Sequence, residues 1–528
     1  MRFRPGRRAA RAAVLAGATG AVLVGSAHAP ASVHLGDRTT AITTAPSAAG
    51  PSEVPVDRAG LVCPGPEQRG MTDSAVPEIA QDVRVEAVSA PEEALPGIVT
   101  RPGATAGAVA VRRLAGAPVG EIGDRGSMAR TSLDEADAVV VDAQGALAPG
   151  LGAAQLYHGD QEQRLALSLT GCPAPAEHSW LVAGGGAVGR SERIVLVNPG
   201  VSAVDVRVGV LGAASEAGAD AGEPPGTVVA LGPGEREILL VDALAPGVRA
   251  PVVEVTSSPG PVAAFLGDRW LDGNTDAGMQ LTTPVGPPAT TQVLGGLGSR
   301  PGDGSDVTVR AAVPGSRATV VQVRALTPEG PARVDAEAVV VQSRAAQDIS
   351  VGGLPDEAVA LEVTSERPVV AAAQTRSSES ETGARDLAWS PGMAPLRALG
   401  GTPLPRPPGQ GQVDYSLEVV APRGGRAQVL LQDAGGDVEA QAVDLAAGRT
   451  WSRELDGAAV WVVPESGEVY ATVTARSQVR PRPAPDDVEA RRGGGRGARR
   501  VPVDLVSVLP VTDLAVTRPV LAVVPAVP

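Results

Sequence analysis

The chain has 528 residues, of which 65 are Gly and 48 are Pro, while aromatic residues make up only 2%. That length exceeds what one hydrophobic core organises and predicts about three to five domains. The formal charge of −14 argues against nucleic acid or anionic lipid as a partner of the molecule as a whole, because such binding depends on clustered basic groups.

Residues 1–29 have the pattern of an export signal. Five arginines and no acidic residue occupy positions 1–11, and small apolar residues follow from Ala12 to Ala27. A positive head, a short apolar middle and small residues at the exit are typical of a secretory signal peptide. The alternative is an uncleaved N-terminal membrane anchor, although the apolar stretch is barely long enough to span a bilayer. Both readings place the protein outside the cytoplasm, either secreted or tethered to the cell envelope.

Residues 30–60 are rich in Ala, Pro, Ser and Thr and lack hydrophobic periodicity, which predicts a flexible linker. Residues 61–179 follow as an N-terminal β domain, because short β-like runs alternate there with turn residues. Cys63 and Cys172, the two cysteines of the chain, flank this domain. In an exported protein an even number of cysteines predicts a disulfide, and no CxxC spacing favours a redox thiol.

A strand-rich segment of about 100 residues recurs three times after this domain. Its copies are marked by opening strands at 193–200, 307–315 and 415–424, and by closing strands at Val262, Val369 and Val469. The steps of 107 and 100 residues between the closing strands match the size of one β-sandwich. The sequence therefore predicts an all-β fold of tandem immunoglobulin-like β-sandwich modules, with the N-terminal domain as a diverged fourth copy.

The repeats set the expected boundaries. Repeat 1 covers 180–290, repeat 2 covers 291–402, and a Pro-rich linker at 403–411 precedes repeat 3 at 412–528. An insert of Arg, Gly and Pro at 477–500 interrupts repeat 3, after which strand-like runs resume. Repetition alone leaves open whether the copies stack side by side or close around an axis, so a β-propeller-like closed array is the alternative.

Three motifs occur in a characteristic order: Cys63-Pro64, then Cys172-Pro173 ahead of Trp180, then a strand that ends at Asn198-Pro199. This arrangement resembles an actinobacterial family of exported proteins, catalogued as domain of unknown function 5719. The likeness covers roughly residues 60–525. It implies an exported or membrane-tethered β protein and carries over no catalytic residue.

Candidate catalytic groups are few. A hydrolytic triad needs a basic His, and beyond the leader only His34, His158 and His178 are present, without a Gly-x-Ser-x-Gly motif. No His and Cys lie at zinc-ligand spacing, and the glycines at 184–189 precede a strand rather than a helix that would hold a phosphate. We therefore expect no catalytic, metal-binding or cofactor-binding residue and no enzyme activity.

Trp270 and Asp272 form the one candidate ligand surface. Asp272 opens an acidic run that spaces oxygen ligands like a Ca²⁺ loop, but its glycine is misplaced, so an Asx-rich turn is the better interpretation. Trp270 lies next to charged residues and is the best candidate for an exposed ring on which a sugar stacks.

These features favour a non-catalytic exported cell-envelope protein with a structural or adhesive role. The expected partners are envelope proteins or wall polymers, with no nucleic acid and no cofactor. The basic stretch at 491–500 suits a polyanionic wall polymer, or is simply a solvated loop. The alternative function is binding of a cell-wall glycan through Trp270, and a secreted hydrolase is the least supported class.

Overall fold

The computed structural model describes residues 53–70, 81–95, 97, 107–213, 225–297, 306–407, 411–482 and 501–519. The expected leader, most of the expected linker at 30–60, and residues 483–500 of the insert lie outside the described residues. Glu53–Val520 form one unit by their contacts. Helical structure in the described ranges is limited to the short turns η1 (Glu92–Ala94), η2 (Gly145–Leu147) and α2 (Val241–Leu244).

Four sandwich modules with two facing sheets each follow one another along the chain. The first module pairs β2 (Arg58–Cys63), β7 (Val139–Gln144), β4 (Ala108–Arg113) and β5 (Pro118–Ile122) in one sheet, and β6 (Met128–Leu133), β3 (Val83–Ser89), β8 (Leu151–Gly159) and β9 (Ala166–Gly171) in the other. The second pairs β10 (His178–Val182), β15 (Val252–Ser258), β12 (Val204–Leu211) and β13 (Gly226–Leu231), and β14 (Glu235–Leu240), β11 (Arg190–Asn198), β16 (Ala263–Asp272) and β17 (Thr275–Thr282).

The third and fourth modules repeat this pattern. One sheet of the third module contains β18 (Ala289–Gly295), the first part of β24 (Ala360–Arg376), β20 (Thr319–Thr327), β21 (Gly330–Ala332) and β22 (Val339–Val341). Its other sheet contains β23 (Ala346–Val351), β19 (Val307–Ala312), the second part of β24 and β25 (Leu387–Met393). The fourth pairs β26 (Gly400–Pro403), β31 (Ala459–Gly467), β28 (Gly425–Gln432) and β29 (Val438–Leu445), and β30 (Arg449–Leu455), β27 (Asp414–Ala421), β32 (Tyr470–Val479) and β33 (Val503–Val511).

The pairing order confirms the predicted all-β class and the sandwich modules. In the first module the second strand, β3, pairs with the fifth, β6, and the third, β4, pairs with the sixth, β7. Immunoglobulin domains contain the same two neighbour pairs, which make their Greek-key core. The edges differ, because here the first strand and the last two strands extend opposite sheets.

Alternating side chains explain why these segments form strands. In β12, Val204, Val206 and Val208 are buried while Asp205 and Arg207 between them are exposed. This period of two places one face of the strand in the core and the other in water. β11, in the middle of its sheet, is instead buried on both faces, as its continuous apolar run Ile194–Val197 reflects.

Several segments differ from the expected boundaries, and three of them form part of the sandwich sheets. Residues 58–60, expected in the linker, belong to β2 and pair with β7. Gly400–Pro403, expected at the end of repeat 2 and the start of the Pro-rich linker, form β26 and pair with β31 in the fourth module. Ser477–Val479, expected in the insert, continue β32 and pair with β33. In each case hydrogen bonds to a neighbouring strand outweigh a local composition typical of loops.

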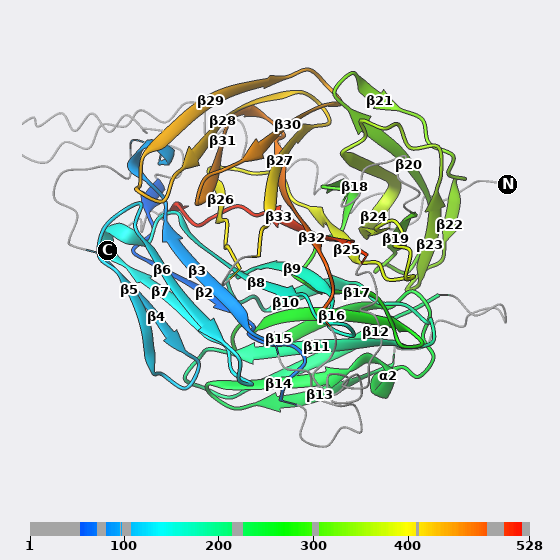
Figure 1. Cartoon of the computed structure of the whole chain (residues 1–528), viewed down its shortest axis with the longest axis horizontal. Helices are drawn as coiled ribbons and strands as arrows, with labels where there is room; N and C mark the ends of the chain where they lie inside the picture. The colour runs from blue at the N-terminus through cyan, green and yellow to red at the C-terminus, as the bar shows by residue number, and fades with distance from the viewer. Residues whose placement is uncertain are drawn as a thin grey trace, which may run out of the picture. The chain divides into compact units, whose positions relative to one another are not determined.

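The last strands of the four modules, β9, β17, β25 and β33, contact one another in a closed cycle (Figure 1). β9 contacts β17, β17 contacts β25, β25 contacts β33, and β33 contacts β9. Each module remains a two-sheet sandwich, whereas a propeller blade is a single sheet. The modules therefore have the predicted sandwich architecture and also close on themselves, as in the alternative arrangement.

Asp386, next to the first residue of β25, joins all four modules. Its fully buried carboxylate accepts backbone N–H bonds from Leu167 (3.2 Å) and Val506 (3.0 Å) at Oδ2, and from Met279 (3.3 Å) and Leu387 (2.9 Å) at Oδ1. The four donors lie in or next to β9, β33, β17 and β25, respectively. One carboxylate thus accepts a backbone N–H group from the last strand of each module.

A second layer of hydrogen bonds follows the same cycle. The backbone N–H of Leu169 donates to Ser507 Oγ (2.9 Å), that of Leu281 donates to Ser168 Oγ (3.0 Å), and that of Trp389 donates to Gln280 Oε1 (2.7 Å). Each bond connects the last strand of one module with that of its neighbour. Side chains therefore replace the strand partner that these edges lack.

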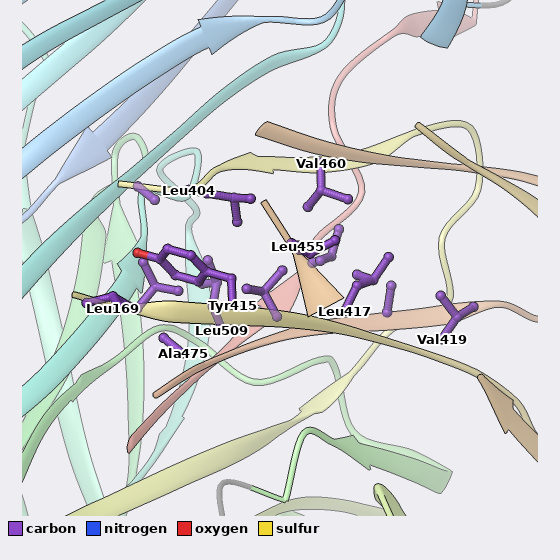
Figure 2. Close-up of a cluster of buried hydrophobic side chains, with 14 of the residues drawn as sticks. Leu169, Leu404, Tyr415, Leu417, Val419, Leu455, Val460, Ala475 and Leu509 are labelled. Atoms are coloured by element: carbon purple, nitrogen blue, oxygen red, sulfur yellow. The ribbon is translucent and has the colours of Figure 1, made fainter. Parts of the chain in front are cut away.

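The first and fourth modules share a hydrophobic core (Figure 2). Leu169 of β9 belongs to the same buried cluster as Tyr415, Leu417 and Leu509 of the fourth module. The two ends of the described unit also pair, since β1 (Glu53–Pro55) runs antiparallel to β34 (Thr517–Pro519). The cycle is therefore closed by apolar packing as well as by hydrogen bonds.

The disulfide expected between Cys63 and Cys172 is present. It links the end of β2 to the residue after β9, so it connects the first strand of the first module to the last. Both sulfur-bearing side chains are buried. A loop of this length gives a stabilisation of about 4 to 5 kcal/mol in the chain-entropy model, as an upper value.

We predict that Asp386→Asn lowers the free energy of unfolding by about 2 to 4 kcal/mol at pH 8, because the amide NH₂ replaces an oxygen that accepts two buried backbone N–H groups. Urea unfolding of the purified chain measures this. Asp504→Asn, an exposed residue of β33, is the control and should change stability by less than about 0.5 kcal/mol. Equal stability of Asp386→Asn and the parent would contradict the role of this carboxylate.

Four buried acids predict that the folded unit is more stable in mild acid. They are Glu67, Glu192, Asp276 and Glu418, and burial is the main cause that raises the pKa of each to about 7. Because the folded state holds these protons where the unfolded chain has lost them, the stabilisation is complete below about pH 4 and disappears as the pH rises through 7. We expect the urea midpoint to fall between pH 5 and pH 8.

Glu418→Gln tests the origin of this dependence, since Gln is a neutral analogue of the protonated acid. Glu418 accepts hydrogen bonds from Ser416 (2.7 Å) and Thr474 (3.0 Å). The substitution should flatten the change in unfolding free energy from pH 5 to pH 8 by an amount on the order of 3 kcal/mol. A midpoint that rises with pH in the parent chain would refute the prediction.

Candidate functional site

Trp270, the predicted ligand platform, is engaged by contacts within the protein. It lies on β16 and is half-buried, and its indole N–H donates to the carbonyl oxygen of Val188 (3.2 Å). The guanidinium carbons of Arg190 and Arg376 lie 5.4 and 5.5 Å from the ring centroid, within cation–π range. Arg376 belongs to β24 of the third module, so the ring serves the contact between the second and third modules.

A buried ion pair supports this contact. Arg190 donates to both oxygens of Asp268 (2.8 and 2.5 Å), which also accepts from the indole of Trp389 (2.8 Å). Burial acts to raise the pKa of Asp268, but Arg190 and the hydrogen bonds outweigh burial and leave that pKa below its ordinary value. The group therefore stays ionised and ties β16 to β25.

Asp272, the second predicted site residue, is exposed at the end of β16. It begins the tight turn to β17, in which Gly273 has a φ of +61° that favours glycine. Among the described residues, no group of three His, Cys, Asp or Glu side chains is placed to hold a metal ion. The run from Asp272 to Asp276 is divided in the structure, because Asp276 is buried and accepts the backbone N–H of Gln163 (2.7 Å).

A polar cleft of about 820 Å³ lies between the first and fourth modules and was not predicted from the sequence. The first module contributes the end of β8 and the segment after it, and the fourth contributes the end of β32. Its charged and polar lining residues include Arg69, Asp82, Asp134, His158, Asp160, Arg164, Gln412, Ser477, Arg480 and Arg482. This cleft is the candidate functional site.

Hydrogen bonds across one wall of the cleft join the two modules. The backbone N–H of Arg482 donates to the carbonyl oxygen of Asp160 (2.8 Å), and that of Glu162 donates to the carbonyl oxygen of Arg482 (2.9 Å). The Arg482 guanidinium also pairs with the Asp160 carboxylate (2.5 Å). The charge of each side chain is thus compensated before any ligand enters.

His158 and Ser477 meet in the cleft although 319 residues separate them. His158 Nε2 lies 2.9 Å from Ser477 Oγ, and that hydroxyl lies 2.6 Å from the carbonyl oxygen of Gln412, to which it donates. Burial is the main influence on the pKa of His158 and lowers it, while Asp160 acts in the opposite direction. A Ser–His nucleophile needs an acid that orients the base, but the Asp160 carboxylate pairs with Arg482.

A second cavity, of about 600 Å³, is mostly apolar. It is lined by parts of the first, second and fourth modules near Cys172 and Trp180, together with Pro284, Pro287 and Pro510. His178, one of the three histidines considered as a base, reaches its rim and bonds through Nε2 to Glu254 (2.9 Å). Gly184–Gly189 connect β10 to β11 and open no helix, as expected.

Trp270 and Asp272 therefore do not line the polar cleft, and the sequence did not predict the cleft itself. Among its residues only His158 was considered as a possible base, and it is half-buried at the end of β8. The proximity of His158 to Ser477 depends on closure of the module cycle. No local motif of the sequence signals it.

We predict that Trp270→Ala lowers the free energy of unfolding by about 2 kcal/mol, because it removes a half-buried ring and two cation–π contacts. Thermal and urea unfolding measure the loss. Val188→Ser, at a side chain that is 96% exposed beside the ring, is the control and should be close to neutral. Unchanged stability of Trp270→Ala would show that the ring is available to a ligand instead.

In the described part of the chain, no helix is long and apolar enough to cross a membrane. Among solved structures, a biofilm-associated protein domain aligns over 91% of this chain and 99% of its own length at 9% identity, with a TM-score of 0.13. A tandem repeat from the extending region of a large adhesion protein aligns over 76% of this chain and 91% of its own, at 14% identity and a TM-score of 0.08. Neither likeness is strong enough to support an argument about this chain.

A search of curated proteins finds no match. The model of one protein family does match, over residues 127–456. This range runs from β6 of the first module to the end of β30 in the fourth, so it covers more than half of the chain and contains Asp386. The chain belongs to the family of unknown function DUF5719.

Proposed function

We propose that this chain is a non-catalytic exported protein of the cell envelope with a structural or adhesive role. The observation that carries the proposal is the closed cycle of four sandwich modules, whose last strands all donate a backbone hydrogen bond to the Asp386 carboxylate. Modules that share hydrogen bonds and a core have little freedom to move against one another. Such a unit is suited to present a rigid binding surface to envelope proteins or wall polymers.

The disulfide supports the exported location. Cys63 and Cys172 are joined, and disulfides persist mainly in oxidising compartments outside the cytoplasm. The Arg-headed apolar leader in the sequence agrees with this location. Binding rather than catalysis is supported by the contacts of Ser477, whose hydroxyl donates to the Gln412 carbonyl.

We expect the full chain to be recovered in the envelope or medium with Cys63 and Cys172 oxidised, and not in the cytoplasm. Cell fractionation followed by mass spectrometry under non-reducing conditions tests this. The purified chain should also sediment with isolated envelopes, and protease treatment of those envelopes should abolish the sedimentation if the partner is a protein.

Two outcomes would replace the proposal. Undiminished retention on protein-free wall polysaccharide, lost in Trp270→Ala but not in Val188→Ser, would support the glycan-binding alternative. Turnover of ester, peptide or glycoside substrates that disappears in Ser477→Ala would establish a hydrolase. A cytoplasmic chain with two free thiols would contradict the exported location.

A further inference from the structure

We propose that the polar cleft between β8 and β32 binds a short peptide through its free ammonium and carboxylate groups. The inference rests on the proposed non-catalytic binding role and names a ligand class for it. The cleft, at about 820 Å³, lies within the range of roughly 300 to 1,000 Å³ typical of small-ligand sites. Its lining carries both acidic and basic side chains, so a molecule with both signs of charge can pair with them.

The acidic part of the cleft consists of Asp82 and Asp134. Both are exposed, and neither forms an ion pair within the described ranges. Partial burial raises the pKa of Asp82, and repulsion from Asp134 adds to this, although Arg84 acts in the opposite direction. An ammonium group placed at these two carboxylates would relieve their repulsion and gain charge-assisted hydrogen bonds.

Four arginines line the cleft, namely Arg69, Arg164, Arg480 and Arg482, and Arg69 and Arg480 are the two proposed to bind the ligand carboxylate. Arg480 is exposed and has no ion-pair partner among the residues that the structure describes. Arg69 is half-buried, and its Nε has no hydrogen-bond partner there. Arg482 differs, because Asp160 already neutralises it. A ligand carboxylate at Arg480 and Arg69 would supply the missing acceptors, and guanidinium matches carboxylate geometry well.

A neutral sugar suits this lining less well than a peptide. Sugar sites gain much of their contact from exposed aromatic rings, but the one aromatic residue lining the cleft, Tyr157, is 6% exposed and donates its hydroxyl to the carbonyl oxygen of Arg164. A neutral ligand would also leave Asp134 and Arg480 without an ion-pair partner among the described residues. The side-chain amides of Gln161 and Gln412 also line the cleft; Gln161 Oε1 accepts from Arg164 (3.5 Å) and Gln412 Nε2 donates to Asp414 (2.9 Å), which leaves the NH₂ of Gln161 and the Oε1 of Gln412 for the peptide groups of a ligand.

Calorimetric titration of the purified full chain with trialanine tests the proposal. Trialanine with free termini should bind, and its N-acetylated and C-amidated forms should each bind about tenfold more weakly, since each loses one charged contact. Asp82→Asn should remove the discrimination against the acetylated form, and Arg480→Gln should remove the discrimination against the amidated form. This crossed pattern distinguishes two charge contacts from a general loss of structure.

Asp356→Asn and Arg317→Gln are matched controls at exposed positions of the third module and should bind all three peptides as the parent does. The proposal is overturned if trialanine does not bind, if the capped forms bind equally well, or if maltose binds more tightly than trialanine. Those results would leave envelope retention and disulfide formation untouched. A failure of this inference is therefore separable from a failure of the proposed function.

Discussion

The structure depends on one constraint, which is that four edge strands must satisfy their backbone groups where they meet. β9, β17 and β33 each have a strand partner on one side only, and β25 pairs with β24 over Leu387–Pro391 while β18 reaches only its end, at Gly392 and Met393. Buried backbone N–H groups without acceptors are costly, and exposed edges invite pairing with other chains. Asp386 resolves the problem, because a carboxylate has enough lone pairs to accept one N–H group from every module.

Closure of the cycle turns this local solution into a property of the whole unit. The sandwich pattern can be extended indefinitely in a linear array, but the contact between β33 and β9 joins the last module to the first. That contact forms only when about 340 residues have been ordered between the two strands, at a large cost in chain entropy. The shared core around Leu169 and Leu509, the pairing of β1 with β34 and the His158–Ser477 contact together offset this cost.

Much of the fold could be predicted from the sequence, because it is written in local patterns. The alternation in β12 and the recurrence of the closing strands follow from side-chain periodicity, and the two cysteines allow one pairing. β26 could not be predicted, since Gly400-Gly401-Thr402-Pro403 has the composition of a turn and is a strand only because β31 pairs with it. Close approach to the indole of Trp461 explains the glycine at 401, where a Cβ atom would lie 2.1 Å from that ring.

The candidate site was harder to predict for a related reason. Trp270 was chosen because charged residues flank it in the sequence, but the charges that contact its ring are those of Arg190 and Arg376, which are distant in the sequence and act as internal partners. Asp386 and Ser477 carry no local signal, since His158 and three of the four backbone groups that donate to the Asp386 carboxylate come from other modules.

The position of the polar cleft gives ligand binding a mechanical consequence. The cleft lies at the seam where the first and fourth modules meet, and its wall includes the Asp160–Arg482 pair that joins them. A ligand that contacts Asp82 of the first module and Arg480 of the fourth is bound fully only when the cycle is closed. By linkage, any such ligand stabilises the closed form in proportion to its differential affinity. A site at this seam therefore couples recognition to the rigidity of the whole unit, which sites within a single module, such as the turn at Asp272, do not.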